Sequence, residues 1–295
     1  MSTKISVIIP TYNRANLLKR AIDSVINQTY KNWELLIVDN FSTDHTDEVL
    51  KNYKDSRISI FKIHNTGVIA KSRNLGIKKS SGDWIAFLDS DDWWIKTKLE
   101  ICFRNINLKT DLIYHKLFIR KNNRNHCLFN KSLTTKKLNK PIMNNLLLNG
   151  NLINNSSVVV RKKIIQNVQG ISEKKELIAA EDYNLWLKIS ETTENFKFIN
   201  KNLGYYFIHE KNILRQDMSI PTREASMAYI KILSYSEKKL WYANLVYMSA
   251  RYCYLIKDYE KANFLLKSIL SKLDKQKKFK TLFMLLKIFI FNQNQ

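Results

Sequence analysis

Four short apolar segments in the first hundred residues alternate with segments in which apolar residues recur at helical spacing. We interpret the apolar segments as strands at residues 5–9, 33–38, 58–63 and 84–88, and the intervening segments as helices at residues 17–26, around 49–50 and at 68–79. This alternation favours a parallel sheet whose crossover connections are right-handed. The first hundred residues are therefore predicted to form one α/β unit.

Polar residues directly follow each of these four strands. They are Pro10 to Tyr12, Asp39 and Asn40, His64 and Asn65, and Asp89 to Asp92. In open parallel sheets ligands bind in the crevice outside the carboxyl ends of the strands, so we expect these four loops to converge on one ligand site. The chain contains neither a GxGxxG sequence nor a Walker A sequence, which argues against a dinucleotide enzyme and a P-loop NTPase.

The segment WIAFLDSDDWW, residues 84–94, places three carboxylates at the end of the fourth strand. Like charges this close destabilise one another, and solvent, protonation or a bound cation relieves the repulsion. Asp89 and Asp91 lie one residue apart and can face the same side, so both can approach one hard divalent metal ion. The alternative from these residues alone is a solvated acidic loop.

The net charge of +23 is distributed unevenly. Residues 1–100 carry 15 Lys or Arg against 12 Asp or Glu, whereas residues 101–295 carry 34 against 14. A basic remainder indicates an anionic partner, either nucleic acid or an anionic membrane surface, although a general preference for Lys and Asn gives the same excess.

The cysteines and apolar runs bear on cellular location. Cys102, Cys127 and Cys253 match neither a disulfide framework nor a zinc site, so we expect them to be reduced. The N-terminal apolar run is too short for a signal peptide, and no run approaches the roughly 20 residues of a spanning helix. We therefore expect a cytoplasmic protein, peripheral at most on the inner face of the cell membrane.

The second part of the chain is predicted to contain a hairpin and then helices only. Residues 111–120 and 126–130 read as two strands around a charged turn, and residues 158–160 as a further strand. From about residue 222 the spacing is helical, with a break near Lys257 and Asp258. The basic, aromatic stretch 275–291 either lies in a membrane interface or packs on the body of the protein.

Five motifs occur in order along the chain: VIIPTYNR (7–14), VDNFSTDHT (38–46), KSRNLGI (71–77), FLDSDD (87–92) and AEDYNLWL (180–187). Together they resemble the family 2 glycosyltransferases, inverting enzymes of GT-A fold that act in bacterial surface-polysaccharide synthesis. We expect a GT-A catalytic domain at 1–215, with a nucleotide-sugar half at 1–100 and an acceptor half at 101–215, followed by a helical region at 216–295.

The resemblance implies a set of donor contacts. The residue matching Asp39 accepts a hydrogen bond from a ring nitrogen of uracil, and Arg73 reaches toward the nucleotide or its diphosphate, where a guanidinium suits phosphate oxygens. From the residues alone, the alternatives are a turn or capping group for Asp39 and a solvated helix face for Arg73. Asn40 and Phe41 stand where the family often has Asp and Gly. The full donor set is Pro10, Thr11, Tyr12, Arg14, Asp39, Arg73 and Asp89.

The resemblance also implies a metal site for Mn²⁺ or Mg²⁺. Asp91 is expected to coordinate the ion directly, Asp89 to contact it through water or to bind ribose, and His209 to add a further contact. The segment around His209 lacks the basic residue that the family often has two positions earlier, where this chain has Phe207. A lone histidine is also compatible with an ordinary surface or core position.

Asp182 and Glu181 are the expected catalytic pair. The resemblance makes Asp182 the general base that takes the acceptor proton and Glu181 a neighbour that positions it, whereas from sequence alone paired carboxylates also suit a helix N-terminus. Asn155 and Ser156, which precede the strand at 158–160, are expected to bind sugar hydroxyls together with Trp93.

The implied function is an inverting, metal-dependent hexosyl transfer. The donor is a nucleotide sugar, UDP-hexose or UDP-N-acetylhexosamine, and the acceptor is a hydroxyl of a glycan or of a polyprenyl-diphosphate-linked glycan. A nucleic-acid-binding protein is the first alternative, but the charge excess avoids the predicted pocket and no reading motif is present, so we expect no nucleic-acid partner. A sugar-nucleotide-forming nucleotidyltransferase is the second, and the loop PTYNRAN lacks the glycines expected for a triphosphate.

Overall fold

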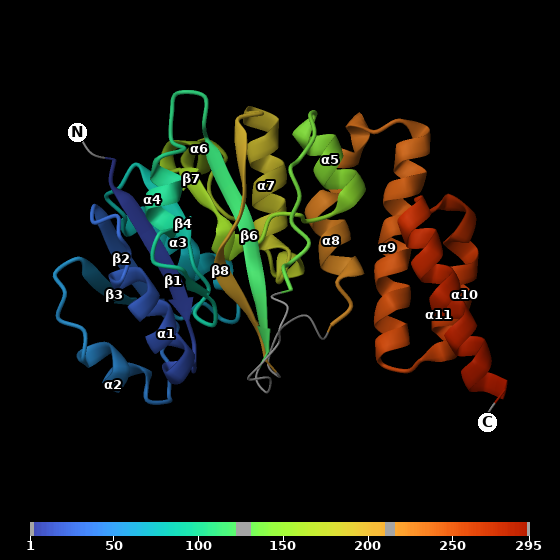
Figure 1. Ribbon diagram of the computed structural model, residues 1–295, viewed down its shortest axis with the longest axis horizontal. Helices are drawn as coiled ribbons and strands as arrows, with labels where there is room; N and C mark the ends of the chain where they lie inside the picture. The colour runs from blue at the N-terminus through green and yellow to red at the C-terminus, as the bar shows by residue number, and fades with distance from the viewer. Residues whose placement is uncertain (1–2, 122–130, 210–215, 294–295) are drawn as a thin grey trace.

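The computed structural model describes residues 3–121, 131–209 and 216–293 (Figure 1). Its centre is one eight-stranded sheet of order β3-β2-β1-β4-β7-β6-β8-β5. The first four strands are β1 (Ile5–Thr11), β2 (Trp33–Asp39), β3 (Ile58–Lys62) and β4 (Trp84–Phe87). They pair in parallel, which confirms the α/β unit predicted for the first hundred residues.

The other half of the sheet is mixed. Its strands are β5 (Trp93–Trp94), β6 (Leu112–Lys121), β7 (Val159–Arg161) and β8 (Phe196–Ile208). β7 runs antiparallel to β4 and to β6, whereas β6 and β8 pair in parallel. The first strand of the predicted hairpin corresponds to β6; the second, at 126–130, lies outside the described residues.

One strand boundary differs from its prediction. Pro10 was expected to end the first strand, but β1 continues to Thr11 and pairs there with Asp39 of β2. β4 has already ended at Phe87, opposite Ile8, so β1 has only one hydrogen-bonding neighbour at this point. A proline without an N–H is tolerated where one side of a strand is unpaired.

Helices cover both faces of the sheet. They are α1 (Ala15–Ile26), α2 (Thr46–Lys51), α3 (Ile69–Lys79), α4 (Lys98–Phe103), α5 (Ile142–Asn149), α6 (Lys162–Asn167) and α7 (Glu181–Thr192). Short 3₁₀ turns lie at Asn155–Ser157 and Lys175–Leu177.

Side chains of β1 alternate between two cores, as the two-residue period of a strand requires. Val7 and Ile9 pack with Leu18 of α1, whereas Ile8 belongs to the cluster that contains Trp186 of α7. A Cβ on Gly76 of α3 would lie 2.6 Å from a methyl carbon of Ile8. Gly76 thus lets α3 pack closely against β1.

The C-terminal part consists of α8 (Ser219–Ser226), α9 (Tyr235–Leu255), α10 (Tyr259–Ile269) and α11 (Lys275–Gln293), with 3₁₀ turns at Met227–Ile232 and Leu270–Lys272. The predicted break is confirmed, since Lys257 has φ 66° and Asp258 caps α10. Trp241 and Leu245 of α9 join the core of the α/β part, whereas α10 and α11 build a separate small core. None of the described helices has the length and apolarity needed to cross a bilayer.

Candidate active site

The site lies where the carboxyl ends of the parallel strands meet the start of α7 and the end of β8. Thr11 and Asp39 are register partners at the ends of β1 and β2, and both are buried. Asp91 and Asp92 follow β4 in the loop before β5 and are buried as well. The prediction that these loops converge is confirmed for the residues that the structure describes.

Asp39 at the end of β2 organises the turn that follows it. Its carboxylate accepts hydrogen bonds from the Ser42 backbone N–H at 3.1 Å and the Ser42 hydroxyl at 2.5 Å. Phe41, which lies in this turn two residues after Asp39, has φ 53°, a left-handed conformation in which glycine would be less strained. Its ring stacks on His64 with 3.9 Å between centroids, a contact that the sequence reasoning missed.

Asp91 contacts three basic side chains. One carboxylate oxygen lies 2.9 Å from Arg14 Nη1 and 2.9 Å from His209 Nε2, so three predicted site residues meet at a single atom. Its backbone carbonyl accepts a hydrogen bond from Arg20 at 2.9 Å. Arg20 was not predicted, and its guanidinium lies 3.6 Å from the ring of Trp93.

Asp92 is buried behind this cluster and accepts a hydrogen bond from the Phe207 N–H at 3.0 Å. Burial, and then the negative charges of Asp91 and Asp89, hold the pKa of Asp92 well above its usual range. The loop therefore concentrates more negative charge than its surroundings compensate.

These donors fit a divalent cation in type. Carboxylate oxygens suit Mg²⁺, and carboxylate together with imidazole suits Mn²⁺. In geometry, the described residues contain no group of three or more His, Cys, Asp or Glu side chains arranged to hold one ion. Asp91 and His209 are the two candidate ligands that contact each other. The Asp91 oxygen that faces His209 also forms an ion pair with Arg14.

Arg73 joins the carboxylates after β4 to those of α7. It is 4% exposed, and its guanidinium lies 2.7 Å from Asp89 Oδ1 and 2.5 Å from Glu181 Oε1. Burial opposes the charge, but Asp89 and Glu181 outweigh it and raise the pKa of Arg73. Arg73 is therefore not on a solvated helix face, and in this structure it faces carboxylates.

Asp182 lies in the first turn of α7, which begins at Glu181. Its carboxylate accepts the Tyr183 N–H at 2.6 Å and a hydrogen bond from Asn151 Nδ2 at 3.1 Å. Burial and the charge of Glu181 raise the pKa of Asp182 to about 7, although Arg73 acts in the opposite direction. A carboxylate with this pKa is suited to accept a proton near neutral pH.

The residues expected to bind the acceptor make contacts within the site. Asn155 Nδ2 donates to Asp89 Oδ1 at 3.1 Å, and the Ser156 hydroxyl accepts the Asp89 N–H at 3.1 Å. Trp93 stacks on Tyr205 with 4.8 Å between ring centroids. Asn155 and Ser156 thus hold the acidic loop in place, and acceptor binding by these three residues stays a prediction.

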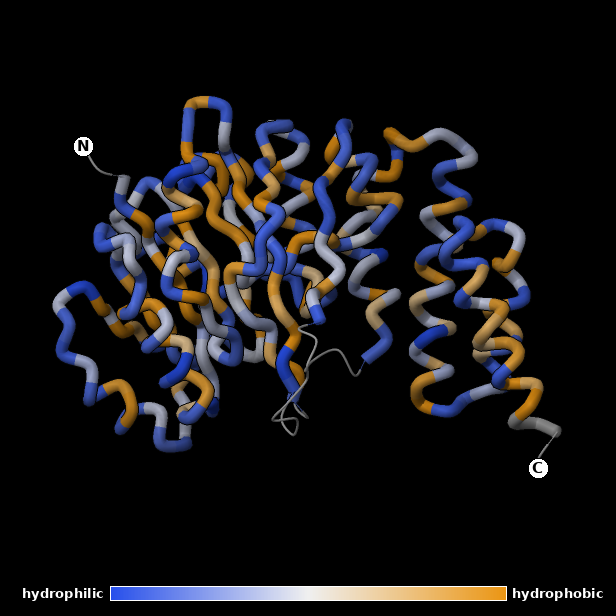
Figure 2. Tube along the Cα trace, viewed as in Figure 1, coloured by the Kyte–Doolittle hydropathy of each residue, from blue (hydrophilic) through white to orange (hydrophobic). Residues whose placement is uncertain are grey.

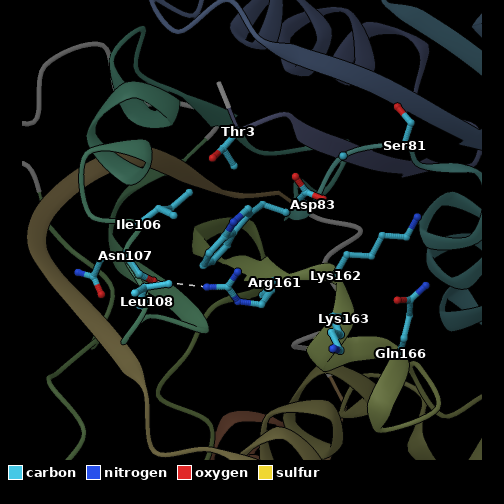
Figure 3. Close-up of a pocket in the computed structure, with 12 residues that line it drawn as sticks. Thr3, Ser81, Asp83, Ile106, Asn107, Leu108, Arg161, Lys162, Lys163 and Gln166 are labelled. Atoms are coloured by element: carbon cyan, nitrogen blue, oxygen red, sulfur yellow. Dashed lines mark hydrogen bonds between the residues drawn. The ribbon is translucent and has the colours of Figure 1, made fainter. Parts of the chain in front are cut away.

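A cavity of about 600 Å³ lies away from these carboxylates (Figure 3). It is lined by Thr3 and Ser81, which precede β1 and β4, so it opens at the amino ends of the strands. Two of its basic side chains have structural partners. Arg161 lies 3.2 Å from Asp111, and Lys162 donates to the Ser80 carbonyl at 2.6 Å.

Solved structures share this architecture. *Staphylococcus aureus* TarS 1–349, crystallised with UDP-GlcNAc, superposes with a TM-score of 0.65 at 17% identity, over 99% of this chain and 92% of TarS. The mannosyltransferase PcManGT of *Pyrobaculum calidifontis*, solved with GDP-Man and Mn²⁺, gives 0.64 at 14% identity, over 99% and 88%. The protein is an α/β protein of the GT-A type, with a mixed, mostly parallel sheet and C-terminal helices.

The sequence profile of Glycosyl transferase family 2 matches residues 6–168, and the chain belongs to this family. It is 32% identical to the *Escherichia coli* UDP-Glc:alpha-D-GlcNAc-diphosphoundecaprenol beta-1,3-glucosyltransferase WfaP over 215 residues, 71% of this chain and 79% of WfaP. An uncharacterized glycosyltransferase of *Rickettsia bellii* is 52% identical over 99 residues, 33% of this chain. The chain spans only 14% of that *Rickettsia* protein's length, and 16% and 20% of two others from the genus.

Proposed function

We propose that this protein is an inverting glycosyltransferase that moves a hexose or N-acetylhexosamine from a UDP-linked donor to a hydroxyl of a lipid-linked glycan. One observation carries the proposal. Arg73 connects Glu181, the neighbour of a carboxyl group with a pKa of about 7, to Asp89 in the acidic loop after β4. The residue next to the proposed base and the acidic loop proposed to hold the donor thus share one ion-pair network.

Asp182 is the proposed general base. The acceptor oxygen forms a bond to the anomeric carbon while the bond from that carbon to the diphosphate oxygen breaks, and the acceptor proton passes to the Asp182 carboxylate. Attack opposite the leaving group inverts the anomeric configuration, as in inverting hydrolysis with a sugar hydroxyl in place of water. Glu181 keeps the base strong by holding the pKa of Asp182 up, and no enzyme nucleophile is required.

The donor is proposed to lie along the ends of β1, β2 and β4. Asp39 would accept a hydrogen bond from a ring N–H of the uracil base. Arg73, with Asp89 beside it, would face the nucleotide or its diphosphate. The remaining proposed donor contacts are Pro10, Thr11, Tyr12 and Arg14.

Asp91, Asp89 and His209 are proposed to hold Mn²⁺ or Mg²⁺. When bound, the ion would neutralise the charge that develops on the departing diphosphate. Mn²⁺ in PcManGT supports a metal in this fold, and the oxygen of Asp91 beside His209 supports the position.

The name of WfaP supports UDP-glucose as donor and a diphosphoundecaprenol-linked sugar as acceptor, and UDP-GlcNAc in TarS supports a UDP sugar. We place the protein in surface-polysaccharide biosynthesis such as O-antigen, capsule or lipopolysaccharide. Residues 1–215 form the proposed catalytic domain, divided at residue 100, residues 216–295 form a helical region, and the reaction takes place on the cytoplasmic side of the membrane.

A screen of nucleotide sugars, with and without a chelator, tests this proposal. Turnover of a UDP sugar that stops on chelation is the expected result; turnover that ignores the chelator removes the metal role of Asp91. Asp182→Asn should keep donor binding and lower transfer by roughly 10²- to 10⁴-fold. Glu191→Gln, an exposed carboxylate at the other end of α7, is the matched control and should leave transfer unchanged. Equal loss of binding and transfer in Asp182→Asn removes Asp182 from the base role.

A further inference from the structure

Helix α11 is apolar on two opposite sides. Met284, Leu285 and Ile288 on its inner side pack into the small core shared with α9 and α10. Its outer side carries six large apolar side chains, each between 51% and 74% exposed. We call these residues the α11 stripe: Phe279, Leu282, Phe283, Leu286, Phe289 and Ile290.

The stripe is continuous. At 100° per residue its six members fall within an arc of about 120°. Three of the six side chains are aromatic. Together the six expose on the order of 600 Å². This is at the upper end of the largest apolar patches on typical soluble monomers, which are often functional. None of the residues that the structure describes covers the stripe, whereas the inner side packs against α9 and α10.

The charges of α11 favour one kind of partner. The helix contains five lysines and no acidic residue. Lys280 and Lys287 lie along one border of the stripe, both exposed, and Lys287 Nζ is 4.7 Å from the ring of Phe283. A second copy of the chain would bring the same lysines to the contact, whereas anionic lipid headgroups complement them.

We propose that α11 docks on an anionic lipid surface. The stripe enters the boundary between headgroups and acyl chains, and Lys280 and Lys287 contact the headgroups. The helix then lies in the plane of the surface, in agreement with the finding that none of the described helices can span a bilayer.

The position of α11 relates this surface to the active site. Figure 2 shows hydrophobic residues concentrated in the second half of α11, and Figure 1 shows that this half and the arrowheads of β1 and β6 point toward the same end of the molecule. With α11 in the plane of the lipid surface, the edge that carries the carboxylates therefore faces along that surface. The relevance of this arrangement to a lipid-linked acceptor rests on the proposed function; lipid binding itself does not.

Sedimentation with vesicles, without any nucleotide sugar, tests the proposal. The wild-type protein should sediment with vesicles of phosphatidylcholine and phosphatidylglycerol and much less with phosphatidylcholine alone. Phe283→Ser with Leu286→Ser should lower the partition coefficient at least about tenfold for each side chain. Lys280→Gln with Lys287→Gln should lower it about fivefold for each lysine, on the anionic vesicles only.

Leu108→Ser is the matched control, because Leu108 is 97% exposed in the loop before β6. It should bind vesicles as the wild type does, and unchanged circular dichroism shows that all variants are folded. The proposal is overturned if the stripe variant binds vesicles like the control, or if light scattering finds a dimer that the stripe variant abolishes. Donor turnover by a stripe variant that no longer binds vesicles separates lipid docking from the transferase reaction.

Discussion

Replacing Asp182 with asparagine is expected to stabilise the folded protein while it strongly lowers transfer. The pKa of this carboxyl group rises from 3.8 to about 7 on folding, because burial and the charge of Glu181 oppose ionisation. Folding is therefore penalised wherever the carboxyl group of the unfolded chain is ionised. The penalty begins above pH 3.8 and is complete above about pH 7. Asparagine does not titrate, and its side-chain oxygen can still accept the Tyr183 N–H.

The size of the pKa shift sets the expected change in unfolding free energy. A rise from 3.8 to about 7 corresponds to roughly 4 kcal/mol of unfolding free energy, at about 1.36 kcal/mol for each pKa unit. The side chain keeps some exposure to solvent, so we expect a measured gain of about 2–4 kcal/mol at pH 8. At pH 4 most of the gain should be lost, and well below pH 3.8 it should vanish, since the carboxyl group is then protonated in both states.

Urea unfolding of the wild type and of Asp182→Asn at pH 4, 6 and 8 measures this difference. Glu191→Gln serves as the control. Its unfolding free energy should differ from that of the wild type by the same amount at all three pH values. A gain for Asp182→Asn that is the same at all three pH values, or a loss at pH 8, would refute the raised pKa and with it the argument for the base.

Three further variants test the network and the packing around it. Glu181→Gln removes the negative charge beside Asp182, so the acid limb of the kcat/KM profile should move down by roughly one pH unit; a limb that stays in place contradicts the coupling. Arg73→Met leaves two carboxylates without their shared cation and should lower the unfolding free energy by about 3–5 kcal/mol in urea titrations; a loss under 1 kcal/mol means that the ion pairs are not formed. Gly76→Ala forces a Cβ to within 2.6 Å of Ile8 and should cost about 1–3 kcal/mol in the same assay; a neutral result means that α3 shifts freely.

The parallel half of the sheet was predictable because its signals are local. Each strand from β1 to β4 is a short apolar run next to a helical segment, and the connections between them leave few alternative orders. The mixed half of the sheet, from β5 to β8, was not predictable in this way. β7 has three residues and β5 has two, and β6 pairs with β8, more than 80 residues further along the chain. No local pattern specifies partners at that separation.

Within the site, too, features set by local sequence were predictable and long-range contacts were not. That the loops after the strands converge follows from topology alone. The stack of Phe41 on His64 needed the register of β2 against β3, and only the unusual aromatic residue after Asp39 signalled it. Arg20 is one of two adjacent basic residues on α1, and nothing in its spacing distinguishes it from Lys19 until it lies over Trp93.

The position of Asp182 could be predicted, but its chemistry could not. A carboxylate in the first turn of a helix is ordinarily stabilised in its charged form by the helix dipole, which lowers its pKa. Here Glu181 directs its own charge into the pair with Arg73, 108 residues away in sequence, and burial excludes the water that would otherwise screen the two acids. The base strength of Asp182 is therefore set first by burial and then by the charge of Glu181, and Arg73, which is remote in sequence, opposes both by lowering the pKa.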